Sequence, residues 1–203
     1  MSLSSTTGRR SLGLAAAVLL LAVALLALSA SAQAITPTPT LAGGYTELTT
    51  DPGTTKALVA NRILPLPVFP SWVIPTKADG QLALRYRFYI TGGQLPGQIF
   101  HSGGLKFVNL KNGKSLTVRD FIIDTAKSEL TAFVPALPGR VPILSLELSG
   151  VPVNKGPIYT KVGPVTAKLT ETAALALNQT LDTTIFSKGL LIGTANVYAR
   201  FAK

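Results

Sequence analysis

The stretch LALRYRFYIT, residues 82–91, decides the fold class. Its apolar and aromatic side chains stand at every second position, namely Leu82, Leu84, Tyr86, Phe88 and Ile90. The positions between them carry Ala83, Arg85, Arg87, Tyr89 and Thr91. A repeat of two over ten residues predicts an antiparallel strand with one buried face and one face toward solvent. Glycines follow directly at Gly92 and Gly93 and predict the end of this strand.

Similar short runs of Val, Ile, Leu, Thr and Phe continue outward from this strand, separated by Gly, Pro and Asn turn signals. They predict strands at 98–101, 105–110, 115–124, 129–134, 141–148, 158–162, 165–169 and 195–201. Two short helices are predicted at 54–61 and 170–178, the second with Thr170 as N-cap and Asn178 at a left-handed C-terminal position. This pattern predicts an all-β fold, an antiparallel β-sandwich or open barrel with one or two short helices.

The N-terminus reads as a targeting segment. Arg9 and Arg10 precede an unbroken apolar run at 12–28, and small residues follow at Ala32 and Ala34. This order predicts a secretory signal peptide of the Sec type at residues 1–34. The alternative is a retained membrane anchor, because the run is nearly long enough to span a bilayer. We therefore expect a product that is secreted or associated with the cell wall, with membrane contact only through an uncleaved signal segment.

The rest of the chain divides into two parts. Residues 35–44 form a Pro/Thr-rich linker by composition, and residues 45–203 have a length that suits one β domain. The full chain contains no cysteine, in agreement with a domain that needs no disulfide.

The chain carries a formal net charge of +10, which raises the question of an acidic partner. Its lysines and arginines are scattered, whereas nucleic-acid binders concentrate them on one face with interleaved aromatic residues. The charge therefore favours a solvated surface and no nucleic-acid partner. Attraction to an acidic cell-wall polymer stays open.

Catalytic chemistry has few candidate residues. His101 is the single histidine, and it stands one position before Ser102, whose side chain would point to the opposite face of a strand. No nucleophile elbow, phosphate-binding loop or set of four metal ligands is present in the sequence. Asp120 and Asp124 would lie about 13 Å apart along one strand, far for a catalytic pair. We predict that the protein is not an enzyme and has no catalytic or metal-ligating residues.

Several segments together resemble a known family. The stretch GQIFHSGGLKF, residues 97–107, resembles the H-x-G-x-L signature of HtaA-type domains, which are secreted and cell-wall-associated bacterial domains. FYITGGQL before it, VRDFIIDTAKSELTAFV after it, and LTETAALALN with FSKGLLIGTANV near the end extend the similarity over roughly residues 45–197. The resemblance implies a β-rich binding domain of the bacterial cell envelope.

The resemblance also implies a ligand and a site. HtaA-type domains bind haem through an axial tyrosine, to which a histidine is hydrogen-bonded, and His101 matches the histidine of the signature. Tyr45 is the nearest candidate for the axial tyrosine by chain position, and Tyr86 and Tyr89 are the alternatives. The expected ligand is haem or another flat apolar molecule.

A second hypothesis rests on LPLPVFPSWVIPTK, residues 64–77, which is too rich in proline for a central strand. Its large apolar residues Phe69, Trp72 and Ile74 could form a lid over a pocket or a surface for a partner. They could equally belong to an edge segment in which Trp72 closes one end of the fold. Under this hypothesis the protein is structural or adhesive, and binds an envelope protein or wall polymer and no small ligand.

Overall fold

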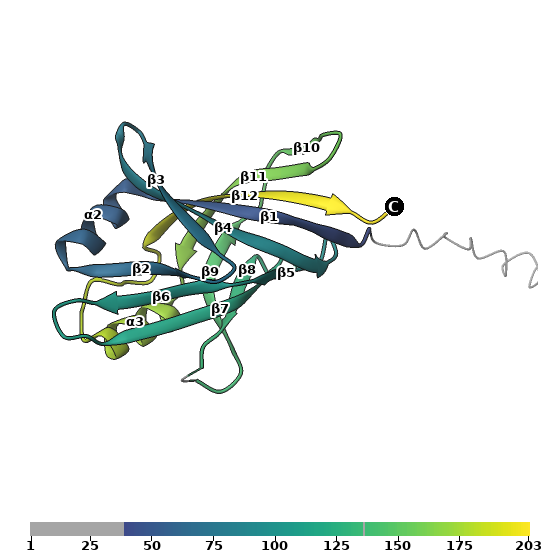
Figure 1. Ribbon diagram of the computed structural model, residues 1–203. Coiled ribbons are helices and arrows are strands. Elements are labelled where there is room, and N and C mark those ends of the chain that lie inside the picture. The colour runs from purple at the N-terminus through teal and green to yellow at the C-terminus, as the bar shows by residue number, and fades with distance from the viewer. Residues whose placement is uncertain (1–38, 136) are drawn as a thin grey trace, which may run out of the picture. The chain divides into compact units, whose positions relative to one another are not determined.

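The computed structural model describes residues 39–135 and 137–203, which form one antiparallel sheet and two helices (Figure 1). The strands are β1 (Leu41–Thr50), β2 (Ile63–Val68), β3 (Trp72–Ala78), β4 (Gln81–Gly93), β5 (Gln98–Ser102), β6 (Gly104–Asn109), β7 (Ser115–Asp124), β8 (Glu129–Phe133), β9 (Arg140–Glu147), β10 (Val153–Lys155), β11 (Thr160–Leu169) and β12 (Leu191–Phe201). The helices are α2 (Pro52–Ala60) and α3 (Glu171–Leu181). The predicted signal peptide and the first four residues of the predicted linker, 35–38, lie outside the described residues.

The sheet closes on itself. Eight strands follow one another in the order β7-β5-β4-β1-β12-β11-β9-β8, and β8 pairs back onto β7 to complete a barrel. The strands β2, β3, β6 and β10 extend this barrel at its edges. The all-β prediction is confirmed, but the predicted sandwich or open barrel is wrong, because the sheet is a closed barrel. Alternation along a strand reports which side chains are buried and is the same for all three architectures, so it could not decide closure.

Side chains that point into the barrel form the core. On β4, Tyr86, Phe88 and Ile90 are buried, as the alternation in the sequence predicts. The prediction is wrong at the start of the strand, where Leu82 is 55% exposed and Ala83 is fully buried. On β1 the inward positions include Thr46 and Leu48, so that this strand contributes a polar group to a mostly apolar interior. An eight-stranded barrel has an interior just wide enough for side chains to fill.

The two helices lie at the same end of the barrel (Figure 1). The helix α2 begins where β1 ends, with Asp51 as N-cap accepting a hydrogen bond from the Thr54 amide at 2.8 Å. The helix α3 begins after β11, with Thr170 as N-cap, which confirms the predicted cap. Its predicted end was wrong, because the helix continues to Leu181 and Asp182 takes the left-handed position, with φ 56°. Asn178 stays helical because its side chain bonds the backbone of Phe186 instead.

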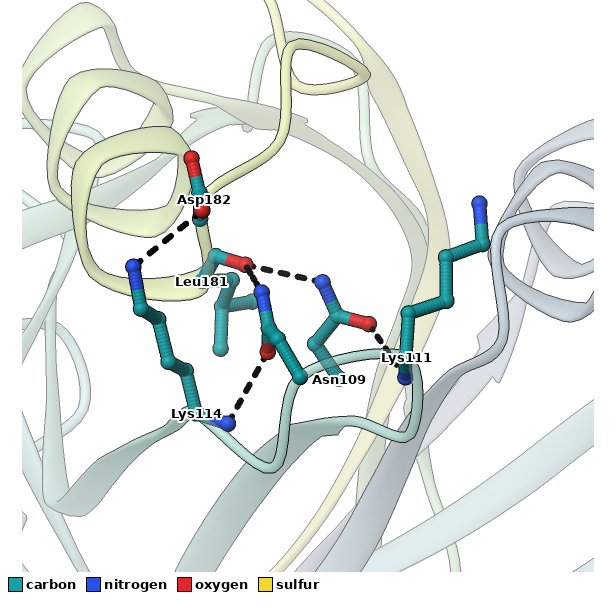
Figure 2. A network of polar contacts seen from close by, with 6 residues as sticks. Asn109, Lys111, Lys114, Leu181 and Asp182 are labelled. Carbon is teal, nitrogen blue, oxygen red and sulfur yellow. Dashed lines mark hydrogen bonds and ion pairs between the residues drawn. The ribbon is translucent and has the colours of Figure 1, made fainter.

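A polar network holds the C-terminal end of α3 against the hairpin between β6 and β7 (Figure 2). The carbonyl oxygen of Leu181 accepts hydrogen bonds from the side-chain amides of Asn109 at 2.8 Å and Asn112 at 3.1 Å. Lys114 forms an ion pair with Asp182 at 3.2 Å. These donors satisfy a carbonyl that the end of a helix leaves without an intrahelical partner, and they place positive charge at the negative end of its dipole.

Replacing Asn109 with alanine is expected to lower the free energy of unfolding by about 1–3 kcal/mol. Asn109 is buried, and its amide also accepts a hydrogen bond from the Lys111 backbone, so the substitution leaves buried groups unpaired. Asn112→Ala is the matched control, because it removes a bond to the same carbonyl from an exposed position. Urea unfolding measures both, and an equal loss in the two variants would contradict this account.

The proline-rich segment forms edge strands, which agrees with its composition. The strand β2 pairs only with β6, and β3 pairs only with β4. The carbonyl of Pro65 accepts a hydrogen bond from the Tyr86 hydroxyl at 2.6 Å. This edge of β2 is therefore linked to β4 by a side-chain hydrogen bond and not by strand pairing. Proline has no N–H, and it is tolerated at an edge that forms no strand ladder.

Several boundaries differ from the sequence-based expectation, and two of the differences change the order of the elements. The strand β1 begins at Leu41, inside the segment 35–44 that composition assigns to a linker. The predicted strands at 158–162 and 165–169 are one strand, β11, with a bulge between Val162 and Val165. Among the described residues, no helix is both long enough and apolar enough to cross a membrane.

Candidate functional site

A row of tyrosines crosses three adjacent strands on the outside of the barrel. Alternation along β1 points Thr46 inward and Tyr45 outward. The register then sets Tyr45 directly opposite Tyr198 of β12 on one side and Tyr89 of β4 on the other. Two further aromatic residues and one arginine join the row from neighbouring segments, and we call the whole set the outer aromatic face: Tyr45, Trp72, Arg87, Tyr89, Tyr159 and Tyr198.

Contacts on the outer aromatic face fix the ring of Tyr45. It stacks on Tyr198 with ring centroids 4.7 Å apart and an interplanar angle of 27°. Tyr159 meets it edge-on at 5.6 Å. The guanidinium of Arg87 lies 4.1 Å from the Tyr45 ring centroid and 4.6 Å from that of Trp72, so one cation contacts two rings. Stacked and cation–π contacts of this kind orient aromatic rings even at exposed positions.

Charged groups around Tyr45 hold this arrangement. Arg87 forms an ion pair with Glu47 at 2.6 Å, and both side chains are largely buried. Burial raises the pKa of Tyr45 above its ordinary value, and the neighbouring Arg87 lowers it in part. Within residues 39–135 and 137–203, no hydrogen bond engages the Tyr45 hydroxyl. Tyr45 therefore presents an oriented phenol whose oxygen is available to a ligand.

His101 lies on the inside of the barrel, on β5, which pairs with β4. It stands opposite Ile90 on β4, and only 5% of its surface is exposed. Its Nε2 is hydrogen-bonded to the Thr46 hydroxyl at 2.7 Å, whereas its Nδ1 has no partner among the described residues. Burial lowers the pKa of His101 to about 4, although the backbone near Phe121 and Ile99 offsets this in part. The ring is therefore neutral at physiological pH.

The structure separates the histidine and the tyrosine that the resemblance pairs. Tyr45 and Thr46 are neighbours in β1, so His101, which bonds Thr46 inside the barrel, lies behind Tyr45 and forms no hydrogen bond with it. Tyr86 is inside the barrel and 1% exposed, with its hydroxyl bonded to Pro65. Burial raises the pKa of Tyr86, which disfavours a phenolate there. Tyr89 is on the outer aromatic face and accepts a hydrogen bond from the Trp72 indole at 3.3 Å.

The three residues predicted as a lid or partner surface lie in different surroundings. Phe69 is 92% exposed at the turn between β2 and β3, and Ile74 is 41% exposed. Trp72 is half-buried against Arg87 on the outside of the barrel, and so does not close an end of the fold. None of the three lines the barrel interior.

Three members of the outer aromatic face were not among the candidate residues from the sequence: Arg87, Tyr159 and Tyr198. Lys161, whose Nζ lies 5.9 Å from the centroid of the Tyr198 ring, was not among them either. Arg87 was assigned to the outward face of its strand, but nothing indicated which residues of β1 would face it. Tyr159 and Tyr198 lie more than a hundred residues from Tyr45, and only strand pairing brings them together. The one feature of the sequence that pointed to them was the presence of five tyrosines in the chain. Among the described residues, no three His, Asp or Glu side chains are grouped closely enough to hold a metal ion.

The fold defines a class: a closed eight-stranded antiparallel barrel with two helices at one end and outlying edge strands. Among solved structures, the C-terminal domain of HtaA from Corynebacterium glutamicum has this fold, with a TM-score of 0.50 at 12% sequence identity, over 79% of this chain and 99% of that one. The haem-binding protein HtaB from Corynebacterium glutamicum is also similar, with a TM-score of 0.46 and 10% identity over 80% of this chain and 95% of its own.

The chain thus has an HtaA-like fold, as the sequence motifs indicated. No protein-family model matches the sequence, and no curated protein sequence matches it either.

Proposed function

We propose that the protein is a non-enzymatic binding module that holds haem on its outer aromatic face, with Tyr45 as the ligand to ferric iron. One observation carries the proposal: Tyr45 has an oriented ring and a hydroxyl free of hydrogen bonds within the described residues. Tyrosine oxygen is an established axial ligand of haem iron in proteins. The resemblance of residues 97–107 to the HtaA signature supports the same ligand.

The neighbouring residues suit a flat anionic molecule. The aromatic rings would contact its apolar plane, and Arg87 and Lys161 would attract its carboxylates. Arg87 is already oriented by Glu47, so binding would order few new side chains. The scattered positive charge of residues 35–203, which is +8 (the +10 of the full chain less Arg9 and Arg10), would add a general attraction to an anionic ligand.

The barrel interior is a poorer site for haem. Its cavity has a volume of about 140 Å³. Pockets for drug-sized ligands usually measure about 300–1,000 Å³. A molecule as large as haem would require the barrel to open, whereas the outer aromatic face needs no such change.

The proposed setting is the cell envelope. This part of the proposal depends on the sequence of residues 1–34, whose charged start, apolar run and small-residue end are typical of a secretory signal peptide. N-terminal sequencing of the protein recovered from culture supernatant and cell wall would test it. A mature terminus near Ile35 supports secretion, and a full-length chain found only in the membrane contradicts it.

Hemin titration tests the proposed function, because the chain has a native reporter. Trp72 is its single tryptophan and belongs to the outer aromatic face. Hemin bound there is expected to quench Trp72 fluorescence saturably, with one equivalent per chain, while a Soret band of bound haem grows with the same affinity. Unsaturated, linear quenching up to micromolar hemin would contradict the proposal.

The affinity for hemin is expected to rise with pH, toward tenfold per unit between about pH 6 and pH 8. Coordination requires the deprotonated tyrosine, and burial raises the pKa of Tyr45, so the free protein keeps the proton over this range. Binding must then release one proton, which higher pH favours. The same titration at several pH values measures this, with Tyr45→Phe as a control whose residual affinity should lack the dependence.

A second function is favoured by one specific observation, the almost fully exposed Phe69 between the two proline-rich edge strands. Leu66 and Ile74 are also exposed on these strands, which suits contact with an envelope protein or wall polymer. Under this alternative the protein is adhesive. Phe69→Ser would then weaken retention on isolated cell walls, and hemin would not bind.

A further inference from the structure

Arg87 stands at the centre of a row of outward-facing residues that strand pairing sets side by side. The register places Trp72 of β3 opposite Arg87 of β4, and Arg87 opposite Glu47 of β1. Both Nε and Nη2 of Arg87 donate hydrogen bonds to Oε1 of Glu47, at 3.2 and 2.6 Å. The guanidinium is therefore held against the Tyr45 ring by the register of three strands and by a paired carboxylate.

The two partners of this ion pair act on the Tyr45 phenol in opposite directions. Burial has the largest effect and raises the pKa of Tyr45. Arg87 then lowers this pKa, and Glu47 raises it to a smaller extent. The neighbouring rings of Tyr198 and Tyr159 add still smaller effects that raise it. A cation next to a phenol favours its charged form, and a carboxylate next to it disfavours that form.

Three other cations point outward from the adjoining strands: Arg85, Lys161 and Arg200. Lys161 contacts a different ring, with its Nζ 5.9 Å from the centroid of Tyr198. Arg200 donates a hydrogen bond to a backbone carbonyl at 3.5 Å. The charges that change the pKa of Tyr45 are instead the two of the ion pair.

We infer that Arg87 is a positioning residue of the haem site: its guanidinium stabilises Tyr45 as the tyrosinate that coordinates iron, and Glu47 fixes Arg87 in place while opposing its charge. The inference rests on the proposed function, because it concerns the same tyrosine. Binding breaks the O–H bond of Tyr45, releases the proton to water and forms the bond from oxygen to iron. The ion pair thus sets how readily the site accepts iron at a given pH.

The opposite effects of the two charges can be measured without hemin. The chain has five tyrosines, so ¹³C NMR of tyrosine labelled at the carbon that bears oxygen gives at most five signals, and Tyr45→Phe identifies one of them. In an alkaline titration, Arg87→Gln should move the ionisation of Tyr45 to higher pH, and Arg87→Lys should move it less far. Glu47→Gln should move it to lower pH.

A purely structural role of the ion pair gives a different result. Arg87→Gln and Glu47→Gln would then weaken the same contact and shift the Tyr45 ionisation in the same direction. That outcome, or an ionisation that neither variant moves, overturns the inference. If Arg87→Gln fails to fold, Glu47→Gln decides, because glutamine keeps an oxygen that can accept from the guanidinium.

Two further signals control this titration. Lys161→Gln removes a positive charge that contacts Tyr198, and it should leave the ionisation of Tyr45 where it is. Tyr86 reports on the fold, because burial raises its pKa and its signal stays that of a phenol until the barrel unfolds. Shifts of the Tyr45 signal are therefore read only while Tyr86 stays protonated.

Hemin titration at about pH 7 separates this inference from the proposed function. Arg87→Gln should lower hemin affinity about three- to tenfold, and Glu47→Gln should raise it by a similar factor, the range for a unit charge about 4 Å away in water. Hemin that binds through Tyr45 with the same affinity in both variants would support the proposed function and overturn the role of Arg87. A wild-type protein that binds no hemin would overturn the function, and the role of Arg87 at a haem site with it.

Discussion

Replacing Tyr45 with phenylalanine is expected to lower hemin affinity by more than about a hundredfold. Loss of a residue that merely supports a metal ligand typically lowers affinity 10- to 100-fold, so loss of the ligand itself should exceed that range. The variant keeps the aromatic ring, and with it the stacking on Tyr198 and the contact with Arg87. Its only chemical loss is the hydroxyl oxygen, which no hydrogen bond engages within the described residues.

Two matched variants make this result specific. Tyr198→Phe removes a hydroxyl from the ring that stacks on Tyr45. Because the stacked ring remains and no bond to iron is lost, hemin affinity should change less than about threefold. Tyr86→Phe removes a hydroxyl inside the barrel and should leave hemin affinity unchanged. If Tyr198→Phe lost as much affinity as Tyr45→Phe, the iron ligand would be assigned to the wrong tyrosine.

Replacing Gly193 with alanine is expected to lower the free energy of unfolding by more than about 3 kcal/mol. Gly193 lies at the start of β12, opposite Thr50 of β1, and has φ +152°. A Cβ atom there would overlap the carbonyl oxygen of Thr49 and lie 2.8 Å from the Cα of Thr50. Glycine in a strand often marks close approach of another backbone or a bend that a barrel requires. The two strands would have to separate at the helix-covered end.

Gly113→Ala is the control for this prediction. Gly113 has φ +73° in the hairpin between β6 and β7, and an added Cβ would meet nothing within 4 Å. Its substitution should cost only the conformational strain, about 1–2 kcal/mol. Urea unfolding of both variants separates strain from the clash. Equal losses of unfolding free energy in the two variants would mean that the close approach of β1 and β12 adds nothing to the destabilisation.

The sequence predicts most strands well because each is encoded locally. Residues 82–91 alternate strictly in the sequence, and the structure contains them in β4 with Tyr86, Phe88 and Ile90 facing inward, although Leu82 at the start of the strand is exposed and Ala83 is buried. The strand β1 was missed because LAGGYTELTT contains a Gly-Gly pair and no clear apolar alternation. Its place between β4 and β12 depends on pairing with residues far along the chain. The same limit applies to barrel closure, which requires one additional pairing, β7 with β8.

The candidate site was only partly predictable for the same reason. His101 was singled out because it is unique, but its face is set by the pairing of β5 with β4, which turns the ring inward. Tyr45 was chosen by chain position, whereas its role now depends on Arg87 and Tyr198, which arrive from two other strands. Local patterns show which residues alternate, and tertiary register determines which of them meet.

Resonance Raman spectroscopy of the hemin-loaded protein tests the central claim most directly, because it detects iron-bound tyrosinate. We predict tyrosinate vibrations in the wild-type complex that shift when the protein contains ring-deuterated tyrosine. These bands should persist in Tyr198→Phe and Tyr86→Phe and disappear in Tyr45→Phe. A wild-type complex without tyrosinate bands, or bands that survive in Tyr45→Phe, would contradict the assignment of Tyr45 on the outer aromatic face as the ligand to haem iron.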